Sequence, residues 1–270
     1  MQQIMEKRTL YGHGLWNVKI WIGLGLIFLI LNTFNRSELS SPFWFSEYIL
    51  YALMIVGLWA NQRYGLRKRI AIPRRLAPAA YIFLSWLFGM LYEMGLTVNG
   101  QGIGGVHQET FASFILAQGD YITIAIVSYV LIRKLRLSFR EMFFVAGGKS
   151  LMEGVFMGVL MATILSPWFI LTPTLIGYYT LAYSSFIALP LLFIYEELLW
   201  KDGRQGKKHS AFFFLVLGFI LAWPIRIFWG LVYGPIVTRL LNLPPQPYVG
   251  FVCKLVQKSN FLEIKLNELA

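Results

Sequence analysis

Five polar side chains stand out in this apolar sequence because their types suit acid–base chemistry or ligand binding. They are Glu93, His107, Glu109, Asp120 and Arg226. Carboxylates and an imidazole can exchange protons, and a guanidinium can hold an anion. The glycines of GQGIGG, residues 100–105, would let backbone N–H groups approach a ligand closely. We therefore expect these residues to build a substrate-binding pocket that opens outward.

The same residues also have a purely structural explanation. Glycines serve turns, and Glu93 and Glu109 can simply be solvated. A charge in hydrocarbon costs on the order of 2.5 kcal/mol or more, so Asp120 and Arg226 can form a buried ion pair. At about 1.5 Å per residue, Asp120 lies about 13 Å below the outer edge of its helix, a depth comparable to that of Arg226. Both explanations place Asp120 near Arg226. They differ in whether these residues bind a ligand.

A second set of charged residues is expected at the inner side of the membrane. Its members are Lys149, Glu153, Glu196 and Glu197. Lys149 precedes Glu153 by four positions at the start of one apolar segment, and the other two residues end the next segment. A lysine four residues before a glutamate is the less favourable order for a helical ion pair. This order indicates that Lys149 and Glu153 each have another ion-pair or hydrogen-bond partner.

The segment YEELLWKDGR, residues 195–204, resembles the EExxxR signature of the CAAX-protease-like intramembrane proteases. Glu196 and Glu197 match the paired glutamates, but Lys201 stands in place of the arginine. The downstream histidines are also absent, because Trp223 occupies the histidine position of the FxxxH pattern that follows Phe219. The resemblance therefore implies a relative without the catalytic residue set.

The sequence predicts no metal site and no cofactor. The chain has 3 histidines, and we expect His13 and His209 in the cytoplasm but His107 outside, so they cannot share one zinc ion. The single cysteine, Cys253, excludes an intramolecular disulfide and a cysteine-based metal cluster. No phosphate loop, dinucleotide fingerprint or nucleophile elbow occurs in a suitable context.

The composition indicates an integral membrane protein. The 270 residues are 57% hydrophobic and only 14% charged, with a mean hydropathy of +0.60, whereas soluble domains have about 25% charged residues. The net charge of +11 is explained by basic loops that stay in the cytoplasm, and we expect no nucleic-acid partner. The expected partners are the lipid bilayer and either a small-molecule solute or another membrane subunit.

The apolar segments predict an all-α polytopic bundle of about seven transmembrane helices, within a range of six to eight. The candidates are residues 16–33, 44–60, 77–92, 111–132, 151–171, 174–194 and 211–238. The last segment is interrupted around Pro224 and is either one kinked helix or a re-entrant pair. We expect the bundle to occupy residues 1–243, followed by a short cytoplasmic or interfacial tail over 244–270.

Basic residues alternate between loops and predict the orientation. They are Arg63, Arg67, Lys68, Arg69, Arg74 and Arg75 after the second segment, Arg133, Lys134, Arg136, Arg140 and Lys149 after the fourth, and Lys201, Arg204, Lys207 and Lys208 after the sixth. The opposite loops hold one basic residue, Arg36. Because cytoplasmic loops carry the excess of lysine and arginine, we expect the N-terminus in the cytoplasm and the GQGIGG loop outside.

Three function classes fit this sequence. A transporter or permease-like subunit for a small or amphipathic solute would use the segments broken by proline and glycine to line a cavity. An assembly or scaffold subunit would use its many aromatic residues as packing and interface surfaces, without a site. A membrane-embedded lipid-modifying enzyme would need Glu93, His107, Glu109 and Asp120 as acid, base or metal ligands.

Overall fold

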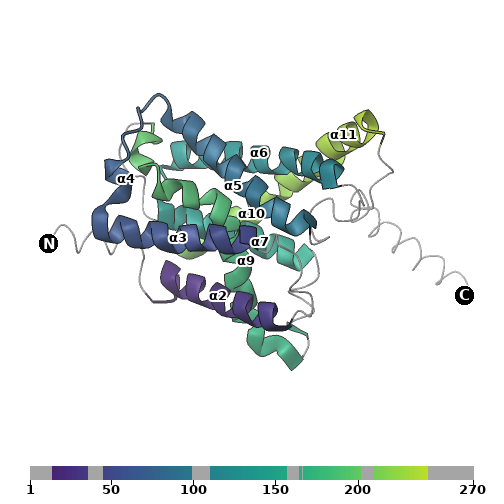
Figure 1. Ribbon diagram of the computed structural model, residues 1–270, viewed down its shortest axis with the longest axis horizontal. Helices are drawn as coiled ribbons and strands as arrows, with labels where there is room; N and C mark the ends of the chain where they lie inside the picture. The colour runs from purple at the N-terminus through teal and green to yellow at the C-terminus, as the bar shows by residue number, and fades with distance from the viewer. Residues whose placement is uncertain are drawn as a thin grey trace, which may run out of the picture.

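The computed structural model describes residues 14–35, 45–98, 110–156, 164–165, 167–201 and 209–242. Within these ranges all regular secondary structure is helical, and there is no β-strand (Figure 1). The all-α prediction is therefore confirmed for the described residues. The tail over 244–270, His107, Glu109 and the GQGIGG loop lie outside them.

The helices follow one another with short connections. The first half contains η1 (Gly14–Trp16), α2 (Val18–Asn35), α3 (Phe45–Tyr64), α4 (Leu66–Arg69), α5 (Ala77–Val98), α6 (Thr110–Leu135) and α7 (Phe139–Phe156). The second half contains η3 (Pro167–Leu171), α9 (Thr172–Ile187), η4 (Leu189–Leu192), η5 (Glu196–Leu198), α10 (Ala211–Phe228), the π-helix η6 (Trp229–Tyr233) and α11 (Gly234–Leu240).

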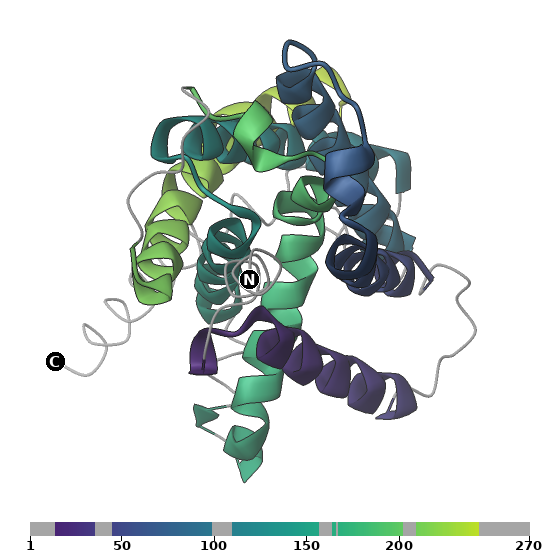
Figure 2. The same ribbon diagram turned by 90° about the vertical axis from the view of Figure 1, so that its left-hand side faces the viewer.

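Helix α9 lies in the middle of the bundle and contacts α2, α3, α5, α6 and α7 (Figure 2). Glycines allow the closest approaches between helices. A methyl group added at Gly25 of α2 would lie 2.7 Å from the carbonyl oxygen of Gly177 in α9. One added at Gly148 of α7 would overlap the carbonyl oxygen of Leu215 in α10. Small residues that let helix backbones meet are typical of helix packing in membranes.

The helix boundaries differ from the predicted ones at α7. This helix begins at Phe139, well before the expected start at residue 151, so Arg140 and Lys149 lie on the helix and not in a loop. Residues 142–150 are all buried, because α7 packs between α9 and α10. A search for uninterrupted apolar segments misses this helix, because glycines and a lysine interrupt the apolar sequence.

The sixth and seventh segments also differ from expectation. Helix α9 ends at Ile187, and the chain continues through the 3₁₀ turns η4 and η5 in place of a single helix to residue 194. Pro190 lies in η4. Because proline has no backbone N–H, it cannot donate the hydrogen bond that would continue an α-helix. In contrast, the chain stays helical through Pro224, and one helical segment runs from Ala211 to Leu240. This continuous path favours the single helix over the re-entrant pair.

Two helical segments in the described part of the chain are long and apolar enough to cross a membrane. They are Phe114–Leu135 and Ala211–Leu240, and a shorter apolar helix covers Val18–Leu31. Length and composition of these helices point weakly to membrane association. A bundle of about seven spans and the side of the N-terminus stay predictions.

Candidate functional site

Charged and tyrosine side chains from several helices meet inside the bundle around Glu153. We call this group the Glu153 cluster, and its members are Glu93 of α5, Asp120 and Tyr121 of α6, Lys149 and Glu153 of α7, Tyr183 of α9 and Arg226 of α10. The three carboxylates and Lys149 are buried. The cluster thus gathers ionisable groups where water is largely excluded.

Glu153 is the most heavily contacted member. Its Oε1 lies 2.6 Å from Nζ of Lys149, and its Oε2 lies 2.8 Å from Nη2 of Arg226. The hydroxyl of Tyr183 donates a hydrogen bond to the same Oε2. The ammonium of Lys149 also lies 4.2 Å from the centre of the Tyr183 ring, a cation–π distance. One carboxylate therefore joins α7, α9 and α10.

A second carboxylate, that of Glu93, joins α5 to α6. The hydroxyl of Tyr121 donates to Oε2 of Glu93 at 2.9 Å, and both side chains are buried. Gly89 makes this approach possible, because a side chain at that position would overlap the Tyr121 ring. The Tyr121 ring meets Phe186 of α9 edge-on at 5.1 Å. Tyr121 is thus held between the polar cluster and the apolar core.

Asp120 differs from the other carboxylates of the cluster. It is 2% exposed, yet its Oδ1 has no hydrogen-bond partner in the described structure. It lies near enough to Arg226 and Tyr121 for electrostatic interaction. Arg226 nevertheless forms its ion pair with Glu153, and the described residues show none between Arg226 and Asp120. The expected Asp120–Arg226 pair is therefore replaced by a Glu153–Arg226 pair beside Asp120.

The structure brings Lys149 and Glu153, expected in the inner set, together with Arg226, expected in the outer set. Because α7 begins at Phe139, Glu153 lies near its far end, where Asp120 and Arg226 also lie. Lys149 and Glu153 form an ion pair despite their unfavourable order along the helix. Arg226 and Tyr183 supply the additional partners that this order suggested.

Glu196 lies apart from the Glu153 cluster, in the turn that follows α9. Its Oε2 is 2.6 Å from Nη1 of Arg67 in α4, with both side chains largely buried. The backbone N–H of Arg67 donates to Asn61, whose side-chain amide donates in turn to the carbonyl of Leu192. Burial raises the pKa of Glu196 above its ordinary value, although the Arg67 guanidinium opposes this effect. These contacts hold the turn after α9 against α3 and α4.

Glu197 is exposed and accepts a 2.8 Å hydrogen bond from the hydroxyl of Tyr195. Burial, followed by the hydrogen bond to Glu197, raises the pKa of that phenol. Neither Glu196 nor Glu197 contacts a histidine among the described residues. The described residues also contain no group of three or more histidine, cysteine or acidic side chains placed to hold a metal ion.

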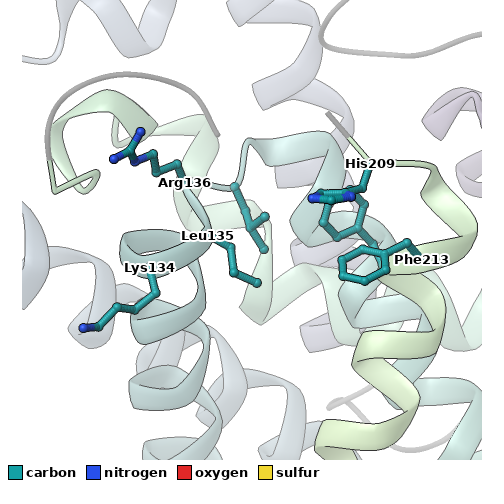
Figure 3. A pocket seen from close by; sticks show the side chains of 7 residues that line it. Lys134, Leu135, Arg136, His209 and Phe213 are labelled. Atoms are coloured by element: carbon teal, nitrogen blue, oxygen red, sulfur yellow. The ribbon is translucent and has the colours of Figure 1, made fainter. Parts of the chain in front are cut away.

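A cavity of about 270 Å³ lies at the opposite end of α6 from Asp120, where that helix ends and α10 begins (Figure 3). Its lining residues are Lys134, Leu135, Arg136, Leu137, His209, Phe213 and Phe214. In Figure 3 His209, Leu135 and Phe213 face one another across the cavity, whereas Lys134 and Arg136 extend away from it. The side chains that face the cavity are therefore mainly apolar, and the two basic side chains point away from it.

Comparison of the chain with models of known protein families, with curated proteins and with solved structures gave no significant match. The resemblance of residues 195–204 to the CAAX-protease-like signature thus has no support beyond those residues. The ion pair between Glu196 and Arg67 gives that glutamate a structural role.

Sequence reasoning missed the two tyrosines of the Glu153 cluster. Tyr121 and Tyr183 are two of 14 tyrosines, and nothing in their local sequence separates them from the others. One weak signal is that Tyr121 directly follows Asp120, the only acidic residue within its apolar segment. The cavity beside Lys134 was missed because its basic residues had already been explained by membrane orientation.

Proposed function

We propose that the protein is a multi-pass membrane protein that acts as a transporter or permease-like subunit for a small or amphipathic solute. The apolar composition and the two helices long enough to cross a membrane support the location. The alternating basic loops support a cytoplasmic N-terminus. The Glu153 cluster supports the function and serves as the candidate binding site.

The observation that carries this proposal is the burial of opposite charges contributed by separate helices. Ionisable residues inside membrane proteins are costly, and they commonly mark solute or ion pathways. The side chain of Arg226 is 29% exposed while that of Glu153 is 4% exposed, so Arg226 is the member of this ion pair that a solute would meet first. A solute carboxylate or phosphate would compete with Glu153 for Arg226, and a solute amine would find the free oxygen of Asp120.

The helix that carries Arg226 becomes irregular directly after it. The π-helix η6 begins at Trp229, whose indole N–H donates to the carbonyl of Leu116 in α6 at 2.9 Å. The hydroxyl of Tyr233 donates to the carbonyl of Ile115 on the same helix. Single π-turns within helices occur frequently at functional sites. The irregular turn joins the helices that carry Arg226 and Asp120, which suits a site that must rearrange.

The test begins with thermal unfolding of the purified protein in detergent with small carboxylates, organic phosphates and amines. A bound solute stabilises the folded state, so we expect at least one to raise the melting temperature of the wild type. Phosphatidylcholine vesicles that contain the protein should take up this solute faster than protein-free vesicles.

The matched variants are Arg226→Met, which should lose both stabilisation and uptake, and Arg63→Gln, which removes an exposed charge elsewhere and should retain both. If no solute stabilises the protein, or if uptake equals that of protein-free vesicles, the transport proposal fails.

An assembly subunit is the second candidate, favoured by the apolar surface along α10, η6 and α11. Phe212, Ile220, Leu231 and Leu240 are 62%, 57%, 66% and 76% exposed. Such a surface suits either lipid or another membrane subunit. Native mass spectrometry of the detergent-extracted protein tests this candidate, because a stoichiometric second chain would support it and a free monomer would contradict it. The described residues offer no observation that favours a lipid-modifying enzyme.

A further inference from the structure

Asp120 and Arg226 differ in how easily a solute could reach them. The side chain of Arg226 is 29% exposed, whereas Asp120 is 2% exposed and its Oδ1 is buried without a hydrogen-bond partner in the described structure. A solute would therefore meet Arg226 before Asp120. A solute amine needs room beside the oxygen that it binds, whereas a proton needs almost none. The buried oxygen of Asp120 is thus better suited to a proton than to a group of the solute.

Arg226 can exchange Glu153 for a solute anion without leaving that carboxylate unpaired. Glu153 would keep its ion pair with Lys149, at 2.6 Å, and its hydrogen bond from Tyr183. A guanidinium can hold an oxyanion through two parallel hydrogen bonds. A cationic solute, by contrast, would have to displace Lys149 or Arg226 from Glu153. The contacts therefore favour an organic anion as the solute.

An anion on Arg226 would add a negative charge beside Asp120, because Asp120 interacts electrostatically with Arg226. The anion and the Asp120 carboxylate would then share one arginine. Like charges disfavour each other's ionised form, and the effect is strong where water is largely excluded. Binding of a proton to Asp120 removes this repulsion. Linkage is reciprocal, so the anion and the proton should each strengthen the binding of the other.

The other ionisable groups that surround Asp120 are engaged in contacts of their own. Besides Arg226, they are Glu93 of α5, Tyr121 of α6, Lys149 and Glu153 of α7, Tyr183 of α9 and Tyr233 of η6. Each of them forms a hydrogen bond or an ion pair within the described structure. Among the carboxylates of the Glu153 cluster, Asp120 is the one with a buried oxygen that lacks a hydrogen-bond partner in the described structure. Asp120 is therefore the group that can accept a proton without breaking an existing contact of that oxygen.

We propose that the Glu153 cluster binds an organic anion and a proton together, the anion on Arg226 and the proton on Asp120. The proton adds to a carboxylate oxygen of Asp120 and gives a neutral carboxyl group. It leaves as H⁺ when the anion leaves Arg226, and no bond within the solute forms or breaks. The proposal rests on the solute-binding function proposed above, and it names the class of solute and the ion that binds with it.

The experiment uses benzenesulfonate, which stays ionised between mildly acidic and mildly alkaline pH, so that any pH dependence of its binding comes from the protein. Isothermal titration calorimetry of the detergent-purified protein, repeated in buffers with different ionisation enthalpies, measures the protons taken up with each anion. We expect binding about tenfold weaker at the alkaline end of this range, a typical coupling between two sites. The proton uptake should then reach about half a proton or more per bound anion at its maximum.

Asp120→Asn is the decisive variant, because asparagine resembles a protonated aspartate in shape and charge. It should bind benzenesulfonate at alkaline pH as tightly as the wild type does at acidic pH, without proton uptake. Arg226→Met should lose anion binding. Glu197→Gln is the matched control, because it removes an exposed acid outside the cluster and should keep the wild-type proton uptake. The melting temperature without ligand shows whether each variant is folded.

Absence of benzenesulfonate binding, binding without proton uptake, or unchanged proton uptake in Asp120→Asn would each overturn the proposal. Tighter binding of benzylamine, a cation of similar size, would also overturn it. In phosphatidylcholine vesicles that contain the protein, an inward proton gradient should accumulate benzenesulfonate. Uptake that does not respond to the gradient would leave transport standing and overturn the coupling to protons. Proton-linked binding without uptake of any solute would instead contradict transport alone.

Discussion

Glu153 interacts with two cations and a phenol, whereas Asp120 has a buried oxygen without a hydrogen-bond partner in the described structure. Removing one member of a buried ion pair typically costs about 3–5 kcal/mol, because the remaining charge is left without compensation. The loss is smaller where the remaining charge keeps other partners. The residues of the cluster should therefore differ sharply in their contribution to stability.

We expect Glu153→Gln to lower the detergent melting temperature more than Arg226→Met does. The first change leaves two cations without their carboxylate, while the second leaves Glu153 with Lys149 and Tyr183. Asp120→Asn should cost less than either change, because Asp120 forms no ion pair in the described structure. Thermal unfolding of the single and double variants measures these losses and the coupling between them.

The double variants separate the two possible partners of Arg226. Glu153→Gln with Arg226→Met should lose less than the sum of the single losses, because both remove one ion pair. Asp120→Asn with Arg226→Met should be closer to additive. Strong coupling of Arg226 to Asp120, and none to Glu153, would contradict the observed pairing.

Glu196 should make stability depend on pH. It lies beyond the end of α9, outside the proposed spans, and burial raises its pKa above the ordinary value of 4.5. A carboxyl with a raised pKa in the folded state binds its proton more tightly there than in the unfolded chain. Its contribution to stability is therefore fully present below pH 4.5 and is lost as the pH rises through the raised pKa.

Glu196→Gln should remove this part of the pH dependence. The melting temperature of the variant should fall less than that of the wild type between pH 4.5 and neutral pH. Glu197→Gln is the comparison, because its exposed side chain makes only the smallest contribution to the raised pKa of Glu196 and should change the profile far less than Glu196→Gln does. If the melting temperature of Glu196→Gln changes with pH over this range as that of the wild type does, then burial does not raise the pKa of the Glu196 carboxyl.

The residue types of the candidate site were predictable from the sequence, but their pairing was not. Acids and an arginine inside or at the end of apolar segments are conspicuous, and Asp120, Arg226 and Glu93 were identified for that reason. The sequence could not show that Glu153 belongs with them, because its depth depends on where α7 begins. Which carboxylate binds Arg226 is decided by helix packing, which periodicity and charge do not reveal.

At the scale of elements, α7 and α10 meet through glycines whose hydrogens face backbone atoms. A methyl group at Gly148 would overlap the carbonyl of Leu215, and one at Gly218 would overlap the carbonyl of Val145. Backbone atoms cannot rotate away as a side-chain end can, so the helices would have to separate. The boundaries of α7 and α9 were mispredicted for a related reason, since backbone packing and Pro190 override the apolar pattern there.

Gly148→Ala and Gly218→Ala should each lower stability by about 1–3 kcal/mol or more, the usual effect of overpacking a close contact. The control is Gly23→Ala in α2, where an added methyl group meets nothing within 4 Å. Alanine favours a helix over glycine by about 1 kcal/mol, so this control should melt at or above the wild-type temperature. Thermal unfolding in detergent compares the three variants. Wild-type melting of Gly148→Ala would contradict the close contact between α7 and α10.

At the scale of the whole molecule, the helix order and the basic loops together predict which side each loop faces. Seven spans would be formed by α2, α3, α5, α6, α7, α9 and the continuous segment Ala211–Leu240. An odd number of spans puts the two ends of the chain on opposite sides. The sequence alone left the C-terminal side open, because a re-entrant last segment was an alternative. The helical path through Pro224 favours a single crossing.

A reporter that is active only in the cytoplasm tests this topology. Fusions after Arg69, Arg136 and Lys208 should be active, because these residues belong to the basic loops, and fusions after Gly104 and Thr172 should be silent. A fusion at Ala270 should also be silent, since Ala211–Leu240 has 30 residues, about 45 Å of helix, against a hydrocarbon core of about 30 Å. Activity after Gly104 would invert the orientation and place Arg226 at the cytoplasmic side. Activity at Ala270 with silence after Gly104 would mean that the last segment does not cross the membrane, and the seven-span topology would be wrong.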